Sequence, residues 1–386
     1  MKNYIFLYSV ILSATTSCAQ NEYKLSDEMI YHISVEQISN KLEFNEVFEE
    51  YIYIPLKKTA DYTIGKISQL LATEDRLFVV SDGIYCFDFE GNPIYNISNK
   101  GHARNEYILC ESVSISDSLL YMYDRGKRQI HAYEIATGKF LYNIPSPSAE
   151  SIYRIGNGFV VEDLFHIRKK NSKADIEGNS RFFVYNGNMN ELQYMAFSEE
   201  QHFHYIGFPS ALGSDCYLYA DYYKCKLYKI LPDKVVSYLQ IDCEPKYRNT
   251  PKEILKAINS PEVRMDDLHG LEHIGETYTH IFGQFTFKGE TYQFFFDKKS
   301  GHSKIGPYFT TIDGHQIWYT SNRDELFSSS NYLIRYFTPE RLSANQSIMR
   351  NTLLSASHTD YKKQQIILDC KPEDNPIVVM YKFRSF

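Results

Sequence analysis

The stretch LFVVSDGIYCFDFEGNPIYNI, residues 77–97, decides the fold, because short apolar segments alternate in it with tight polar turns. The same layout returns in LYMYDRGKRQIHAYEIATGKFLYNI, residues 120–144, whose closing LYNI nearly repeats the IYNI of the first unit. A third copy spans 217–241 and begins with YLYAD. Each copy predicts short β-strands joined by turns, since aromatic and β-branched residues favour strands and Gly, Pro, Asn and Asp favour turns.

The spacing of these copies predicts the architecture. Asp82 and Asp124 hold matching positions about 42 residues apart, a period within the range of propeller blades. The longer gap from Asp124 to Asp221 leaves room for one diverged unit around 159–197. A blade of four strands has two apolar faces, which neighbouring blades cover when the blades are arranged in a ring. We therefore expect an all-β, six-bladed β-propeller with short helical insertions.

The expected ring has five blades within the chain and one that closes it. The five lie at 65–98, 107–145, 150–197, 204–242 and 268–305. The sixth would combine residues 306–320 with a strand at each end of the chain, 51–56 and 375–382. Pairing the two end strands would close the ring and remove its open sheet edges.

Two segments predict helices between strands. The sequence TPKE at 250–253 is a capping box with proline at the first helical position, and Pro261 would end that helix. The sequence TPE at 338–340 begins a second helical stretch, with Leu342, Met349 and Leu353 at helical spacing.

The first residues of the chain predict export. Lys2 precedes an apolar run from Ile5 to Ala14, and the small residues 15–17 lead directly to Cys18. This run of roughly ten residues suits a secretory signal peptide and is too short to span a membrane. A cysteine directly after small residues resembles the lipobox of bacterial lipoproteins, so we expect Cys18 to be lipidated; the alternative is an ordinary signal peptide with a chance cysteine. The expected divisions are 1–17 signal peptide, 18–48 N-terminal tether and lead-in, and 49–386 propeller.

Net charge and cysteine content limit which ligands the protein can bind and whether it can form disulfides. The net charge of −7 argues against a nucleic-acid ligand, which calls for a basic surface, and against a polybasic membrane patch. Apart from Cys18 there are six cysteines, an even number that permits disulfides in an exported protein. Buried free thiols are the alternative. These cysteines are Cys86, Cys110, Cys216, Cys225, Cys243 and Cys370.

Four features together resemble a known family, the six-bladed β-propeller lipoproteins of Gram-negative gut-type bacteria, which are NHL-repeat-like. They are the leader, YIPLKKT at 53–59 (family YIPLETT), KGHARNEY at 100–107 (family KGxGPGEY) and EDNPIV at 373–378 (family DDNPVLVLYKL). The family's GPG is replaced by Ala103, Arg104 and Asn105, so no role of that loop's backbone is carried over. The resemblance implies a propeller fold and an outer-membrane lipoprotein on the periplasmic side or cell surface, and no reaction.

Propeller geometry predicts where a ligand would bind. The loops that lead into each blade, and the turns between its second and third strands, lie at one end of the central channel, a concave place of the kind ligands use. We predict ligand-binding residues at that end: Asp82, Lys100, His102, Arg104, Glu106, Asp124, Arg125, Asp221 and Tyr222. In an extended loop, His102, Arg104 and Glu106 would point to one side. The alternative is that the charges are solvated and the aspartates cap their own turns.

The histidines raise the possibility of a metal site. His202 and His204 would share one face of a strand, and His269 and His273 flank the fifth blade beside the aspartates at 266–267. A metal would need all of them to converge, whereas histidines are more often simply hydrogen-bonded. The sequence also lacks a GxSxG, P-loop, GxGxxG or HExxH motif, so we expect no metal and no cofactor.

These observations favour a binding or scaffold module anchored to a membrane through its N-terminal lipid, with a glycan, peptide or envelope protein as ligand. The abundance of tyrosine, 33 residues, suits both sugar stacking and protein contact. The alternative is a glycan-active propeller hydrolase or lyase; a third reading is assembly with a partner through the inserted helices. Glu22 stands alone until Asp27 and Glu28, which favours the periplasmic side over surface export.

Overall fold

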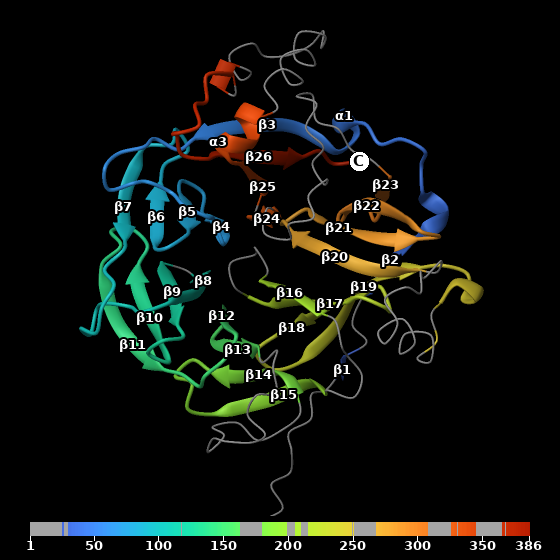
Figure 1. The fold of residues 1–386 in the computed structure, drawn as a ribbon. Coiled ribbons are helices and arrows are strands. Elements are labelled where there is room, and N and C mark those ends of the chain that lie inside the picture. The colour runs from blue at the N-terminus through green and yellow to red at the C-terminus, as the bar shows by residue number, and fades with distance from the viewer. Residues whose placement is uncertain are drawn as a thin grey trace, which may run out of the picture.

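The computed structural model describes most of the chain as a ring of six small sheets around a central axis (Figure 1). The described residues are 25–26, 30–116, 118–162, 180–198, 205–209, 215–248, 250, 268–307, 326–329, 331–344, 365–366 and 368–386. The ring confirms the predicted all-β, six-bladed β-propeller.

Each blade is an antiparallel sheet whose first strand lines the axis and whose fourth lies at the rim (Figure 1). Blade 1 is β4 (Gln69–Ala72), β5 (Leu77–Val80), β6 (Ile84–Phe87) and β7 (Pro93–Ile97). Blade 2 is β8 (Cys110–Ser116), β9 (Leu119–Asp124), β10 (Gln129–Glu134) and β11 (Phe140–Pro145). Blade 3 is β12 (Ser151–Ile155), β13 (Gly158–Glu162), β14 (Ser180–Asn186) and β15 (Leu192–Ser198).

The second half of the ring repeats this plan. Blade 4 is β16 (Tyr205–Pro209), β17 (Tyr217–Asp221), β18 (Lys226–Ile230) and β19 (Val235–Asp242). Blade 5 is β20 (His269–Glu276), β21 (His280–Phe287), β22 (Glu290–Asp297) and β23 (Ser303–Gly306). Blade 6 is β24 (Leu326–Ser328), β25 (Tyr332–Phe337), β26 (Ile377–Phe383) and β3 (Phe48–Pro55).

Blade 6 closes the ring with both ends of the chain, as predicted. β26 and β3 are antiparallel neighbours, in register from Ile377 opposite Pro55 to Phe383 opposite Phe48. The predicted inner strands of this blade were wrong, because β24 and β25 come from residues 326–337 and not from 306–320. Residues 308–325 lie outside the described part of the chain.

The core lies between neighbouring blades. In β5 every residue is buried, and alternate side chains join different clusters. Leu77 and Val79 pack toward blade 6, whereas Phe78 and Val80 pack toward blade 2. Successive side chains of a strand point to opposite faces, and in a propeller both faces are covered, which explains why the sequence LFVV is apolar throughout.

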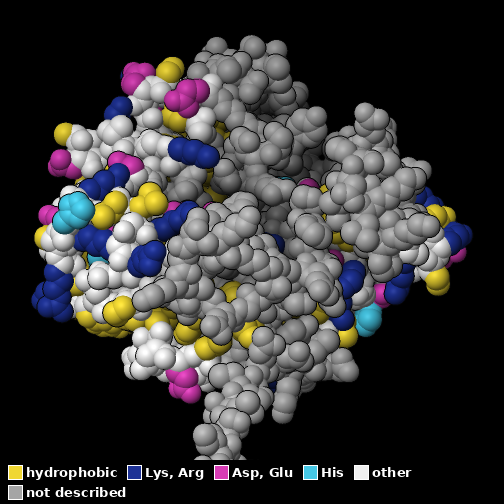
Figure 2. All heavy atoms as spheres, turned by 60° about the horizontal axis from the view of Figure 1, so that its bottom comes forward, with side chains coloured by type: hydrophobic (Ala, Val, Ile, Leu, Met, Phe, Trp, Pro, Cys, Tyr) yellow, Lys and Arg dark blue, Asp and Glu magenta, His cyan; other side chains and the backbone are white. Residues whose placement is uncertain are grey.

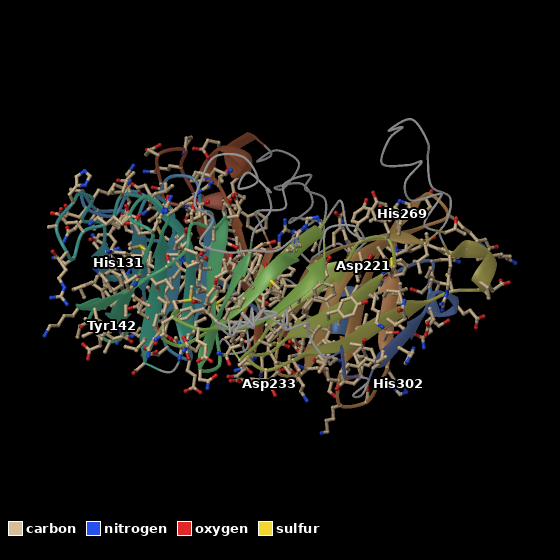
Figure 3. The ribbon with its side chains drawn as sticks, turned by 90° about the horizontal axis from the view of Figure 1, so that it is seen from below. His131, Tyr142, Asp221, Asp233, His269 and His302 are labelled. Carbon is tan, nitrogen blue, oxygen red and sulfur yellow. The ribbon has the colours of Figure 1, made fainter. Side chains whose placement is uncertain are left out.

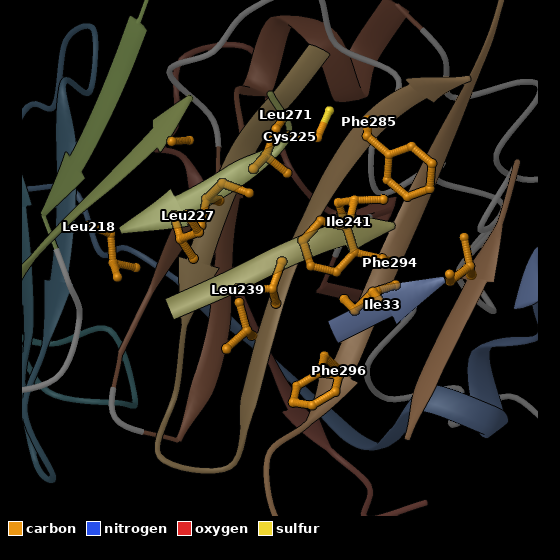
Figure 4. Close-up of a cluster of buried hydrophobic side chains, with 14 of the residues drawn as sticks. Ile33, Leu218, Cys225, Leu227, Leu239, Ile241, Leu271, Phe285, Phe294 and Phe296 are labelled. Atoms are coloured by element: carbon orange, nitrogen blue, oxygen red, sulfur yellow. The ribbon is translucent and has the colours of Figure 1, made fainter. Parts of the chain in front are cut away.

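The cluster between blades 4 and 5 shows the same arrangement in detail (Figure 4). Leu227, Leu239 and Ile241 of blade 4 face Phe294 of blade 5. Ile33, from near the start of the described chain, is fully buried in the same cluster. A segment remote in sequence therefore contributes to the core at the rim of blade 4.

The innermost strands are linked to one another by polar side chains. The Gln69 amide donates to the Val113 carbonyl and accepts from the Val113 N–H, at 2.8 and 3.1 Å. The Ser112 hydroxyl likewise donates to the Ile152 carbonyl and accepts from its N–H. An innermost strand has a sheet neighbour on one side only, so these side chains satisfy backbone groups that would otherwise lie unpaired.

The N-terminal segment forms a strap along the rim, which we define as the described residues 25–26 and 30–47. Its strands β1 (Leu25–Ser26) and β2 (Tyr31–Ser34) pair in parallel with β19. A 3₁₀ turn, η1 (Val35–Gln37), leads to a bridge between Ile38 and Ile305 on blade 5, and helix α1 (Phe44–Val47) leads into β3. Much of the expected tether and lead-in is therefore bound to blades 4 and 5.

The remaining elements are short. Helix α3 (Pro339–Ala344) begins at the predicted TPE sequence and buries Leu342, while η4 (Pro245–Tyr247) follows blade 4. Met349, Leu353 and the helix predicted after residue 250 lie outside the described residues. Among the helices that are described, none is long and apolar enough to cross a membrane.

Three of the cysteines follow the second of the two expectations. Cys86, Cys225 and Cys370 are buried thiols. Burial raises the pKa of the Cys86 thiol to about 11, which keeps it protonated and unreactive at neutral pH.

Candidate functional site

The disc has two faces with different loops. The loops between blades and the turns between second and third strands lie on one face, which we call the connector face. Seen from the rim, Asp221 and His269 lie toward this face, whereas Asp233 and His302 lie toward the opposite face (Figure 3). Strand direction therefore places all nine predicted ligand-binding residues on the connector face.

The loop KGHARNEY at the start of blade 2 is folded and not extended. The Glu106 N–H donates to the Ala103 carbonyl, and the Glu106 carboxylate accepts the Ala103 N–H at 2.9 Å. The Lys127 ammonium donates to the carbonyls of Ala103 and Glu106. The Glu106 side chain is thus bonded to its own loop. The prediction that His102, Arg104 and Glu106 point to one side was wrong, because it assumed an extended backbone and the loop is turned. His102, Arg104 and Lys100 remain exposed.

The Asp124 carboxylate is occupied by hydrogen bonds to the backbone of blade 2 and the loop that leads into it. It is 0% exposed, and its carboxylate accepts the N–H groups of Ile108, Leu109 and Lys127 at 2.9 to 3.2 Å. These bonds hold the loop that leads into β8 against the β9–β10 turn. Burial and three N–H donors leave the Asp124 carboxylate little capacity for a ligand.

The other predicted residues of blades 1 and 2 lie nearer the surface. Asp82 is exposed, accepts a hydrogen bond from the Tyr85 hydroxyl and offers its carbonyl to Tyr107. The Arg125 guanidinium lies 3.4 Å from Glu150 and 3.9 Å from Glu111. Figure 2 shows basic side chains among apolar ones over this part of the ring, at the left of the view.

Asp221 repeats the position of Asp124 in blade 4. It is 1% exposed and accepts the N–H groups of Tyr223 and Lys224. Burial raises the pKa of the Asp221 carboxyl, against the lowering effect of these donors. The Tyr222 carbonyl accepts from the N–H groups of Gly270 and Leu271, which fastens this turn to blade 5.

Glu162 was not among the predicted residues. It ends β13 as Asp124 ends β9, so the repeat itself carried the signal. Its buried carboxylate accepts hydrogen bonds from Arg181 at 2.9 Å, and from Ser151 and Tyr217 at 3.0 Å. Each of the second, third and fourth blades therefore buries an acid at the end of its second strand.

The described surface has a hollow of about 290 Å³ beside the β17–β18 turn. Its wall combines basic, aromatic and amide side chains from the turn, from β18 and β19, and from the connection to blade 5. The lining residues are Tyr223, Lys224, Lys226, Tyr228, Gln240, Ile241, Arg248 and Leu268. We call this the blade 4 hollow.

Hydrogen bonds hold the wall of the blade 4 hollow in place. The Gln240 amide donates to the carbonyls of Lys224 and Ile241, at 3.0 and 2.9 Å. Arg248 and Leu268 form a parallel bridge, so the two ends of the blade 4–blade 5 connection meet at the hollow. The site is therefore built on paired strands and on a connection fixed at both ends.

The charges around the blade 4 hollow are predominantly positive. The Lys224 ammonium lies 3.5 Å from the buried Asp221, and Arg248 lies 3.5 Å from Asp242. The Lys226 ammonium lies 5.2 Å from the centre of the Tyr228 ring, and no ion pair joins it to a described carboxylate. Three cations and two tyrosines thus line the hollow. Two of the cations have a carboxylate partner at 3.5 Å, and the third has none among the described residues.

The predicted residues accordingly fall into two groups. Asp221 and Tyr222 belong to the turn beside the blade 4 hollow, whereas the other seven belong to blades 1 and 2. For a metal, the described part of the chain holds no group of three or more His, Cys, Asp or Glu side chains suitable as ligands. His202, His204 and residues 266–267 lie outside that part.

Comparison with known proteins finds a similar fold in a solved structure and one matching family model. A solved structure from Bacteroides fragilis NCTC 9343, of a protein whose name describes it as exported, is 13% identical with a TM-score of 0.66, over 92% of this chain and 100% of that one. A member of the DUF4221 family from Bacteroides vulgatus ATCC 8482 is 11% identical with a TM-score of 0.48, over 88% and 98% of the two chains. No curated protein sequence matches significantly. Residues 30–382 match the sequence model described as Domain of unknown function (DUF4934), and the chain belongs to this family.

Proposed function

We propose that the protein is a binding module of the cell envelope, and that the blade 4 hollow receives an anionic group of its ligand. The observation that carries the proposal is the gathering of Lys224, Lys226 and Arg248 around one hollow with Tyr223 and Tyr228. Cations bind carboxylate, sulfate or phosphate through charge-assisted hydrogen bonds, which are about twice as strong as neutral ones.

The shape and chemistry of the hollow favour an anionic glycan. A volume of about 290 Å³ is at the lower end for small-molecule sites, enough for one charged sugar unit while the rest of the chain lies outside. Tyrosine rings offer apolar faces with polar tips, which suits sugars. An acidic peptide or an envelope protein would need a larger contact area.

The cellular location is part of the same proposal. The signal peptide with Cys18 supports a lipid anchor in the outer membrane, on the periplasmic side or the cell surface. The name of the Bacteroides fragilis neighbour, an exported protein, is compatible with this. The resemblance to NHL-like propeller lipoproteins supports it as well.

A binding measurement with a matched control tests the proposed ligand. The wild type is titrated by calorimetry with anionic oligosaccharides, such as polygalacturonate fragments and heparin fragments, and with neutral oligosaccharides of equal length. The double variant Lys226→Ala/Arg248→Ala should lose affinity at least about tenfold, since it loses two charge-assisted contacts. Its melting temperature should change little, because Arg248 is exposed and Lys226 is only half-buried.

Lys299→Ala is the matched control, because Lys299 is exposed on the opposite face. It should bind like the wild type. Equal affinity of the double variant and the wild type, or a preference for neutral oligosaccharides, would overturn the proposal. Release of shorter products during the incubation would favour the glycan-active hydrolase or lyase instead.

A further inference from the structure

We propose that the face opposite the connector face lies against the membrane, so that the blade 4 hollow points away from it. The inference rests on the proposed lipid at Cys18 and adds an orientation and a second contact, with the lipid surface. Two separate observations carry it: the path of the strap and the exposed side chains of blade 5.

The strap joins blade 4 at the end remote from the connector face. Leu25 pairs with Val235 and Ser26 with Val236, the first two residues of β19. β19 starts just after the turn at Asp233, which lies toward the opposite face (Figure 3). Because the pairing is parallel, the chain then runs toward the connector face, where Ser34 pairs with Asp242 at the end of β19.

The strap packs into the core between blades 4 and 5. Ile33 is 0% exposed within the core between blades 4 and 5. The Tyr31 ring lies 4.8 Å from Phe296 and 5.5 Å from Tyr238, measured between centroids. The His32 ring nitrogen lies 2.7 Å from the Asp242 carboxylate. The length of tether that separates the lipid from the body therefore ends near Leu25.

The length of this tether decides the orientation. From Cys18 to Leu25 the chain has about seven residues, which span at most about 25 Å. β19 has 8 residues and is about 26 Å long. A tether that turned back along β19 would be too short to carry the lipid beyond the connector face. The opposite face can meet the membrane without such a detour.

Exposed side chains on that face fit a lipid surface. Tyr278, in the β20–β21 turn, is 62% exposed, the most exposed of the large hydrophobic side chains that the structure describes. The neighbouring turn, joined to it by the bond from the Lys298 N–H to the Thr279 carbonyl, carries the exposed Lys299. Tyrosine concentrates at membrane interfaces, and lysine attracts anionic headgroups.

The experiment compares the two faces of the lipidated full-length protein on vesicles of phosphatidylethanolamine and phosphatidylglycerol. A single labelled cysteine is introduced at Ser300 on the opposite face or at Arg104 on the connector face, both exposed positions. A lipid-borne quencher should reduce fluorescence at least about twofold more for Ser300→Cys than for Arg104→Cys. The parent protein gives the background labelling of the native thiols.

A longer tether provides the control. Inserting about 20 Gly and Ser residues after Asn21 adds a flexible spacer and should reduce the difference between the two labels. Replacing Tyr278→Ser in the unmodified tether should reduce it as well. Equal quenching of both labels, or stronger quenching at position 104, would overturn the orientation.

The mass of the intact protein tests the lipid anchor separately from the orientation. An acyl mass on the wild type that is missing in Cys18→Ala supports the anchor. A mature wild type without acyl mass would refute the lipid anchor of the proposed function, and the orientation with it. An acylated, vesicle-bound protein with the reverse order of quenching would refute the orientation alone.

Discussion

The imidazole ring of His280 in blade 5 stacks on the ring of Phe383 at the end of β26, with centroids 4.5 Å apart and planes inclined by 15°. Phe383 also lies 4.9 Å from Phe48 of β3. One aromatic ring thus joins the last strand of the chain, the strand from its beginning, and the neighbouring blade. The carboxylate of Asp297 adds to this closure by accepting the hydroxyl of Ser385 and the N–H of Phe386.

Replacing Phe383→Ala should weaken the closure of the ring. Removing a buried phenylalanine costs about 3–5 kcal/mol, because contacts with its neighbours are lost and a cavity remains. Thermal and urea unfolding of the variant would measure this loss. Ile94→Ala, at an exposed rim position, is the control and should unfold like the wild type. A Phe383 variant as stable as the wild type would contradict the role given to this ring.

The stability of the protein should depend on pH through His280. Burial lowers the pKa of the His280 imidazole to about 4, and Asp297 opposes the shift. Between the ordinary histidine pKa near 6.5 and this value, the unfolded chain binds the proton and the folded protein does not. Stability from this group is therefore lost as pH falls, by on the order of 2 kcal/mol from pH 7 to pH 5.

The variant His280→Gln should remove this part of the acid sensitivity. Urea unfolding at pH 7 and pH 5 would show a smaller change for the variant than for the wild type. His302→Gln, at an exposed position on the opposite face, should retain the wild-type change. An identical pH dependence of the His280 variant and the wild type would show that His280 is readily protonated in the fold.

Within the loop KGHARNEY, Glu106 and Arg104 should behave differently on substitution. Glu106→Ala removes the acceptor of the Ala103 N–H and should cost about 1 kcal/mol of stability. Arg104→Ala should change stability by less than about 0.5 kcal/mol, because its side chain is exposed. Differential scanning calorimetry of the two single variants would measure both effects. Equal losses would mean that the Arg104 side chain also holds the loop.

The buried acid of blade 3 should depend on its arginine. Arg181→Ala leaves the Glu162 carboxylate buried without its cation and should cost about 3 kcal/mol or more. The double variant Glu162→Leu/Arg181→Met, which buries no charge, should cost less than the single variant. Urea unfolding of the wild type and both variants would test this order. If Arg181→Ala unfolds at the same urea midpoint as the wild type, the ion pair with Glu162 does not contribute to stability.

The fold could be predicted where a blade carried strands and turns in a regular order, as at 77–97 and 120–144. The inner strands of blade 6, β24 and β25, were not predicted, because Arg335 interrupts the apolar run of β25. Arg335 is 1% exposed, and its guanidinium lies 5.7 Å from the centre of the Phe337 ring. The strap was not predicted for another reason, since two short strands whose six residues pair with a distant strand leave no local pattern.

For the candidate site, strand polarity alone predicted which loops share a face. It could not predict which side chains meet. Lys224, Lys226 and Arg248 come from a turn, a strand and a connection, and no spacing links them in the sequence. Nor could it distinguish Asp124, taken up by three backbone donors, from the exposed Asp82, because both stand near the end of a strand.

The pairing of β26 with β3 also has a consequence for biogenesis. β3 is among the first strands to emerge during synthesis or secretion, and its partner β26 is the last, almost the whole chain later. Until then β3 has an unpaired edge, and closing so long a loop is slow because the entropy of the intervening chain opposes it. The ring can therefore close only after β26 has been synthesised and delivered, and until then the unpaired strand is open to wrong pairing.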